Sequence, residues 1–201
     1  MLLRSRYKNW GTTRDERHAH LTGDDLVDDP ADQVTRAVTI AASAAEVWRW
    51  LVQIGKGRGG MYSYDWLENA IGLDIHSSDE IRDEWQHLVP GDRIVLVPAG
   101  WPGMKAGYSL PVAQVECGRA IVLRQAPPEH PWNAVWSFAI SPQGPDRCRL
   151  ISRSRTKRIA GVLGTLQWVA TEMMDPITMV MTRKMLLGIK ERAERSSALA
   201  G

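Results

Sequence analysis

Five strand-like segments follow one another after residue 90 with no helix-like segment between them, and this run limits the fold more than any other feature. They are rich in β-branched residues and separated by glycine and proline clusters, and they read GDRIVLVPAG, LPVAQVEC, RAIVLRQA, AVWSFAIS and RCRLISRSRT. Strands joined without helices pair as an antiparallel meander. An earlier strand is predicted at residues 34–40, and a helical stretch at about 161–195 closes the chain. Segregated strands and helices predict an α+β fold.

Two or three helices are predicted between the first strand and the meander. The first, over residues 43–54, opens with the serine and glutamate of a capping box and keeps helical spacing of its apolar residues. A second covers about residues 63–71, and a third opens with another possible capping box and covers about 77–88. Pro176 lies inside the closing helical stretch and predicts a kink or break there.

The chain has the length of one domain with an arm. It has 201 residues, 44% hydrophobic and 24% charged, with a formal net charge of +2. Such a chain can bury a sizeable core, and its composition is near the globular average. Residues 1–33 are polar and acid-rich, which predicts an arm that is either flexible or laid over the body. We therefore expect this arm, one domain at residues 34–195 and a tail at 196–201.

Composition also argues against several classes of protein. No apolar run reaches the ~18 residues of a membrane-spanning helix. The N-terminus becomes charged after three residues and has no apolar core of a secretory signal. Cys117 and Cys148 are too few for a disulfide framework or a cysteine zinc site. We expect a reduced, cytoplasmic protein with no metal and no other cofactor.

The small net charge hides a basic C-terminal quarter. Residues 147–195 hold 11 Lys/Arg and 4 Asp/Glu, a net charge of +7. Such a surface can bind nucleic acid, anionic lipid or an anionic ligand, or it can simply be a solvated face. We expect the solvated face, so nucleic acid is not an expected partner.

Alternation along residues 147–157 separates two faces of a strand. One face carries the basic side chains of Arg147, Arg149, Arg153, Arg155 and Lys157. Because these cannot all be buried unpaired, that face is predicted to be wet and convex. The small side chains of Ser152 and Ser154 then turn toward the long helix and leave room for a ligand. In a second interpretation, a bulge shifts the register and brings Arg153 or Arg155 inside as an anion anchor.

Aromatic and methionine side chains complete the predicted wall. On residues 134–141 the bulky face, with Trp136, is expected to meet the long helix. That helix adds Trp168 and Met173, and methionine adapts to varied apolar ligands. The loops 98–107 and 126–133 each present a tryptophan and are predicted to form the rim.

The order of these elements resembles one superfamily. Together with GKGRGGMYSYDWLEN at 55–69, EWQHLVPGDRIVLVP at 84–98 and MTRKMLLGIKERAE at 181–194, it resembles the SRPBCC superfamily and its bacterial members. This group includes START lipid-transfer domains, aromatic polyketide cyclases and birch-pollen-allergen-like proteins. The resemblance implies a helix-grip fold, in which a curved antiparallel sheet wraps around the long C-terminal helix. It also implies a cavity between them for an apolar or aromatic ligand, but no shared catalytic residues.

The sequence GKGRGG at residues 55–60 satisfies the dinucleotide fingerprint GxGxxG. That motif must follow a strand and open a helix, whereas this one follows a predicted helix. We therefore reject a Rossmann site. A flexible connection between helices, or an anion site using Lys56 and Arg58, are the remaining interpretations.

Polar and aromatic residues on the short helices are the candidates for chemistry. The groups placed to move protons are Asp65, His76 and Glu84, with Tyr64 polarising a carbonyl. His76 and His87 lie eleven residues apart with no third ligand, a poor metal site. The predicted ligand-binding residues are Tyr62, Tyr64, Trp66, Glu68, Trp85, Trp136, Ser152, Ser154, Trp168 and Met173.

The sequence therefore predicts a carrier or binding protein for a small hydrophobic or aromatic molecule. The alternative is an enzyme of the polyketide cyclase or dehydratase kind that uses the acid–base groups at the cavity mouth. A third possibility, binding of nucleic acid or protein by the basic strand, predicts a strong salt dependence.

Overall fold

The computed structural model describes residues 7–130 and 132–200, apart from several side chains of the closing helix. Its six strands form one antiparallel sheet in the order β1-β6-β5-β4-β3-β2. The strands are β1 (Pro30–Ile40), β2 (Arg93–Val97), β3 (Tyr108–Glu116), β4 (Ala120–Gln125), β5 (Ala134–Gly144) and β6 (Arg147–Lys157). The helices are α2 (Arg14–His18), α3 (Ala44–Val52), α4 (Asp65–Ala70) and α5 (Val162–Ala200), with short 3₁₀ turns η1 (Asp24–Leu26) and η2 (Asp83–Trp85).

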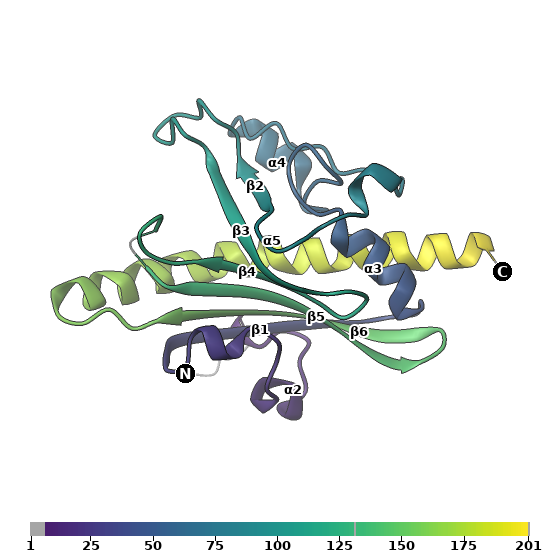
Figure 1. The fold of residues 1–201 in the computed structure, drawn as a ribbon, viewed down its shortest axis with the longest axis horizontal. Coiled ribbons are helices and arrows are strands. Elements are labelled where there is room, and N and C mark those ends of the chain that lie inside the picture. The colour runs from purple at the N-terminus through teal and green to yellow at the C-terminus, as the bar shows by residue number, and fades with distance from the viewer. Residues whose placement is uncertain (1–6, 131, 201) are drawn as a thin grey trace.

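The long helix α5 runs along the sheet, and α3 packs against α5 and against strands β5 and β6 (Figure 1). The α+β helix-grip fold predicted from the sequence is confirmed. The meander is formed by β2 to β6, and β1 closes the sheet beside β6. β1 begins at Pro30, four residues earlier than expected. Within the described residues, no helix is both long and apolar enough to cross a membrane.

The predicted helix starts are partly confirmed. The Ser43 side chain accepts a hydrogen bond from the Glu46 N–H (3.2 Å) and opens α3. The Glu46 carboxylate accepts from the Trp50 indole (3.2 Å). The helix predicted at 77–88 is wrong, since only the turn η2 forms there. Its expected capping serine, Ser77, instead donates to Asp65, a partner outside the segment.

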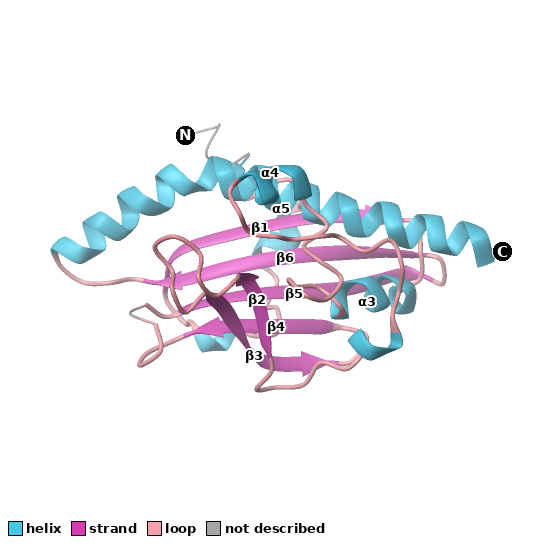
Figure 2. Cartoon of the chain, turned by 90° about the horizontal axis from the view of Figure 1, so that it is seen from above, coloured by secondary structure: helices cyan, strands magenta, loops and turns pink. Residues whose placement is uncertain are grey.

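Of the kink or break predicted at Pro176, the break is wrong, because α5 continues through this residue. Proline removes one backbone hydrogen bond of the helix. Two buried cations support the adjoining turns: Lys8 lies 3.2 Å from Asp175, and Arg36 donates to the Thr178 carbonyl (3.2 Å). Figure 2 shows that the helix bends along its length instead of breaking.

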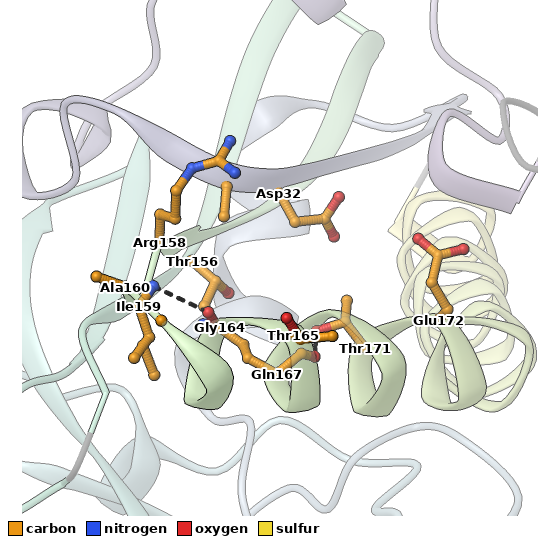
Figure 3. Close-up of a pocket in the computed structure, with 12 residues that line it drawn as sticks. Asp32, Thr156, Arg158, Ile159, Ala160, Gly164, Thr165, Gln167, Thr171 and Glu172 are labelled. Atoms are coloured by element: carbon orange, nitrogen blue, oxygen red, sulfur yellow. Dashed lines mark hydrogen bonds between the residues drawn. The ribbon is translucent and has the colours of Figure 1, made fainter.

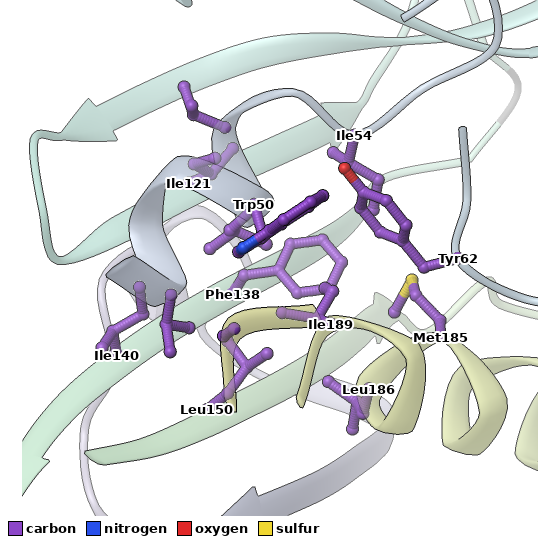
Figure 4. Packing of buried hydrophobic residues seen from close by; sticks show 14 of the residues in the cluster. Trp50, Ile54, Tyr62, Ile121, Phe138, Ile140, Leu150, Met185, Leu186 and Ile189 are labelled. Atoms are coloured by element: carbon purple, nitrogen blue, oxygen red, sulfur yellow. The ribbon is translucent and has the colours of Figure 1, made fainter. Parts of the chain in front are cut away.

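The core fills the space between the sheet and the C-terminal half of α5. Phe138 and Leu150 from the sheet, Trp50 from α3 and Ile189 from α5 belong to one buried cluster (Figure 4). Trp136, Phe138 and Ile140 share the face toward α5, as their alternation predicted. Burial of such apolar side chains is the main stabilising contribution to the fold.

The opposite, outer face of the sheet is covered by the N-terminal arm, defined here as residues 7–28. Its first residues run along the edge of β1, where the Ala37 N–H donates to the Trp10 carbonyl (3.0 Å). Farther on, Val27 packs against Val122 and Val135 on the outer face. Of the two predicted states of this segment, the structure therefore has the one laid over the body.

The wet convex face predicted for the basic strand is wrong at its centre. Arg149 and Arg153 do lie on the outer face, but both are buried beneath the arm. Arg149 pairs with Glu16 (2.7 Å), and Arg153 pairs with Asp24 (2.6 Å). The argument from unpaired charge fails because the arm supplies the carboxylates. The alternative of a register shift is wrong as well, since the pairing of β6 with β1 is regular from Gln33 to Ile40.

Candidate functional site

The inner face of the sheet becomes more polar from one end to the other. Paired positions form rows across the strands, and the row Val38–Leu150–Ile140 is apolar and packed against α5. The next row contains Arg36, Ser152, Phe138 and Ile121. The two rows beyond it contain Val34, Ser154, Trp136 and Leu123, and then Asp32, Thr156, Ala134 and Gln125. We call these last two rows the open end.

Apart from Val34, Trp136 and Leu123, the side chains at the open end are small or polar, and they are half-buried. Trp136, Ser154, Thr156 and Gln125 all keep part of their surface exposed. The Trp136 indole donates to the Ser152 hydroxyl (2.9 Å), which fixes the plane of the ring. A fixed aromatic wall beside small hydroxyl side chains can accept a flat apolar molecule and orient its polar groups.

Several large side chains in the described part of the first half of α5 face solvent instead of the sheet. Met173 is 73% exposed, Ile177 56% and Met174 50%. Among the described residues, polar contacts join this half to β1 through Arg36, to the arm through Lys8 and to the end of β6 through Gln167. These contacts place the described side chains of the helix at the β1 side of the open end, and none of them reaches β4 or β5.

A cavity of about 410 Å³ lies where the open end meets the first turns of α5. Figure 3 shows Asp32 and Thr156 from the sheet opposite Thr165, Thr171 and Glu172 from the helix. Gln167 anchors the preceding loop, accepting from the Ile159 N–H (3.1 Å) and donating to the Lys157 carbonyl (3.0 Å). The volume is in the range of small-molecule sites, and the lining combines polar side chains with apolar surface.

A buried group of charges holds this side of the cavity together. The Lys8 ammonium binds Asp32 and lies 3.2 Å from Asp175 and 3.6 Å from Glu172. Burial raises the pKa of Asp175, and the Lys8 charge opposes that rise. Burial lowers the pKa of Arg36 to about 10. The arm thus ties the sheet to the helix at the site.

A second hollow, of about 490 Å³, lies between α4 and α5 and contains part of the predicted site. Tyr64, Asp65 and Trp66 line it, together with Lys184 and Arg192. The Asp65 carboxylate accepts two hydrogen bonds from Ser77, both at 2.6 Å, so its oxygens are engaged in holding the loop. Trp66 is 71% exposed, and Lys184 lies 5.9 Å from the Tyr64 ring centre.

Two other predicted residues of the α4 region are buried. Tyr62 is part of the core, where its hydroxyl accepts from Gln53 (2.9 Å) and burial raises its pKa. Glu68 is 4% exposed, and its Oε2 has no hydrogen-bond partner within the described part of the chain. Burial, and then the negative charge of Asp65, raises the pKa of Glu68 to about 7.

The remaining acid–base candidates lie in solvent. His76 is exposed and contacts Asp74 (3.2 Å), and Glu84 is exposed near Arg82 (3.7 Å). Trp85 stacks under the Arg82 guanidinium at 4.8 Å. None of these contacts joins them to Asp65, so the structure does not assemble the predicted group of acids and bases.

Of the ligand-binding residues predicted on the sheet and on α5, those on the sheet lie near the open end. Trp136, Ser152 and Ser154 lie on the inner face at or beside the open end. Met173 lies on the exposed side of α5 and does not line the cavity. The side chain of Trp168 is outside the described residues. The glycine-rich loop is no anion site, because Lys56 pairs with Asp74 (2.8 Å) and Arg58 donates to the Val52 and Trp85 carbonyls.

Sequence reasoning missed a hydrogen-bonded group at the rim of the open end. Tyr108 begins β3, Gln125 ends β4, and His130 and Trp132 belong to the loop between β4 and β5. The tryptophan in the loop 126–133 was the available signal. It predicted that this loop forms part of the rim, but it did not indicate that Trp132 binds Gln125 and Tyr108. In the described part of the chain, no group of three His, Cys, Asp or Glu side chains could hold a metal ion.

Neither models of known protein families nor sequences of curated proteins match this chain. Several solved structures are similar to it in arrangement. The Zhui aromatase/cyclase of Streptomyces sp. R1128 is 19% identical, with 85% of this chain and 98% of that chain covered and a TM-score of 0.49. Norcoclaurine synthase from Thalictrum flavum is 14% identical (83% and 96% covered, TM-score 0.47), and a protein from Thermobifida fusca is 17% identical (81% and 93% covered, TM-score 0.49). Such identities describe the overall fold, and no residue role is taken from them.

Proposed function

We propose that this protein binds a small, largely apolar or aromatic molecule at the open end of the sheet, as a carrier or binding protein. The observation that carries the proposal is the change along the inner face, from a packed apolar row to half-buried Trp136, Ser154 and Thr156. Small hydroxyl side chains beside an indole leave space and offer hydrogen-bonding groups, which suits a ligand site better than a close-packed apolar core. The adjoining cavity of about 410 Å³ supplies further volume.

The proposal predicts that filling the open end abolishes binding. Ser154→Trp places a large ring beside Trp136, and we expect the affinity for 2-ethylnaphthalene to fall at least tenfold. Native mass spectrometry first shows whether the purified protein retains a bound molecule. Equilibrium dialysis then measures the dissociation constant for 2-ethylnaphthalene. A thermal melt checks that the variant is folded.

The matched control is Ser141→Trp, the same change at an exposed position of β5. It should leave the affinity unchanged. Equal binding by wild type and Ser154→Trp would contradict the proposal and direct attention to the hollow between α4 and α5.

A cyclase- or dehydratase-like enzyme is the second candidate, and Glu68 is the observation that favours it. A carboxyl whose pKa is about 7 is half-ionised at neutral pH, which suits general acid–base catalysis. Against it, the Glu68 side chain is buried from solvent. The test is whether a molecule retained by the purified protein is converted on incubation, and whether Glu68→Gln stops conversion without reducing binding.

A further inference from the structure

A chain of three hydrogen-bonding side chains fixes the direction of one phenol at the rim. The indole Nε1 of Trp132 donates to Gln125 Oε1, and Gln125 Nε2 donates to the Tyr108 hydroxyl. An indole N–H can only donate, so the amide oxygen must face Trp132. The amide nitrogen of Gln125 must then face Tyr108, which leaves the phenol oxygen as the acceptor.

This arrangement leaves the phenolic proton of Tyr108 available. The hydroxyl uses a lone pair for Gln125, and its own O–H must point elsewhere. Within the described residues, no side chain or carbonyl accepts that proton. Burial raises the pKa of Tyr108, so the group stays protonated at neutral pH and remains a donor.

Tyr108 lies on the inner face of the sheet, next to the open end. It lies on the same face of β3 as Leu110 and Val112, which belong to the inner core. Its partner Gln125 lies in the outermost row of the open end, beside Ala134. The His130 ring meets the Tyr108 ring edge-on at 5.8 Å, and Trp132 stacks on His130 at 6.1 Å. The phenol is therefore held against the His130 ring at the border of the proposed site.

We infer that Tyr108 is a specificity-determining residue, and that the ligand carries a hydrogen-bond acceptor, a carbonyl or ether oxygen, that receives the Tyr108 proton. The inference rests on the proposed function and narrows the ligand class from any apolar molecule to one with an oxygen acceptor at one end. A half-buried donor left without a partner weakens the binding of a plain hydrocarbon, because the hydroxyl loses water and gains nothing.

Two probes of nearly equal shape test this inference. 2-Acetonaphthone carries a carbonyl where 2-ethylnaphthalene carries a methylene group. Equilibrium dialysis gives both dissociation constants for wild type and for Tyr108→Phe, which removes only the hydroxyl. We expect the preference for the ketone, the ratio of the two constants, to fall five- to tenfold in Tyr108→Phe. The difference in hydration between the two probes contributes equally to both ratios, so it cancels when wild type is compared with Tyr108→Phe.

Tyr7→Phe on the arm is the matched control and should leave the ratio unchanged. A ratio that agrees within twofold between wild type and Tyr108→Phe overturns the inference while the proposed function stands. Failure of wild type to bind either probe overturns the proposed function, and the inference with it. A thermal melt shows that each variant is folded, and binding of 2-ethylnaphthalene by Tyr108→Phe shows that the site is intact.

Discussion

Replacement of Arg153 by methionine is expected to lower the free energy of unfolding by about 3 kcal/mol. The Arg153 side chain is 1% exposed and pairs with Asp24, which is 4% exposed. It also donates to the carbonyls of Ala19 (2.7 Å) and Glu16 (2.6 Å) in the arm. Methionine leaves these acceptors and the Asp24 carboxylate buried without their donor. Arg155 lies 3.3 Å from Asp24 and retains part of the pairing, which places the effect at the lower end of such losses.

Denaturant unfolding of wild type, Arg153→Met, Asp24→Asn and the double variant measures this coupling as a double-mutant cycle. The double variant should lose less than the sum of the single changes, because the remaining carboxylate is then neutralised. Arg147→Met is the matched control, on the same face of β6 but exposed, and it should change stability by less than about 0.5 kcal/mol. A similarly small effect of Arg153→Met would show that the arm does not rest on the sheet in solution.

The ion pair between Arg153 and Asp24 also affects the proposed binding site. The arm that Arg153 anchors also carries Lys8, whose ammonium binds Asp32 of the sheet and lies near Asp175 of α5. Loss of the arm would remove Lys8, one of the two buried cations that link the first half of the helix to β1. We therefore expect arm-releasing changes to weaken ligand binding as well as stability.

Periodicity was enough to predict the sheet and the faces of its strands. Alternation placed Trp136 and Ser154 on the inner face and Arg153 on the outer face, and all three assignments are confirmed. It could not say what covers each face. Asp24 lies 129 positions away from Arg153 in the chain, and no local pattern connects them.

The same limit explains the missing helix and the missed rim residues. Ser77 has the spacing of a capping residue, but Asp65 of another element accepts its hydroxyl proton. Tyr108 and Gln125 meet only because β3 and β4 pair and curve together, and Trp132 reaches them from a loop. A propensity argument sees each residue in its own segment, whereas these contacts depend on the assembled sheet.

The second large effect concerns Glu68. We expect its contribution to the free energy of unfolding to become less favourable as the pH rises from 4.5 to 7. Its pKa is about 7 in the folded protein, against an ordinary value of 4.5. Folding therefore keeps a proton on Glu68 that the unfolded chain releases, so this carboxyl lowers stability as the pH rises through that interval. The difference corresponds to about 3 kcal/mol, absent below pH 4.5 and complete above pH 7.

Glu68→Gln removes the titration and keeps the shape of the side chain. The stability of the variant relative to wild type should be about 3 kcal/mol more favourable at pH 8 than at pH 4. Because the comparison is between two pH values, any constant effect of the buried amide cancels. Denaturant unfolding at the two pH values measures it, and Glu84→Gln, an exposed carboxyl, should show no such dependence.

The outcome also bears on function. Glu68 costs about 3 kcal/mol at neutral pH, lies next to Asp65 and has no partner for Oε2 among the described residues. Enzymes place carboxyls of this kind at sites of proton transfer. A pH-independent difference between Glu68→Gln and wild type would mean that Glu68 is ionised and solvated at neutral pH. The enzyme alternative would then lose the observation that favours it, and the binding role at the open end would stand alone.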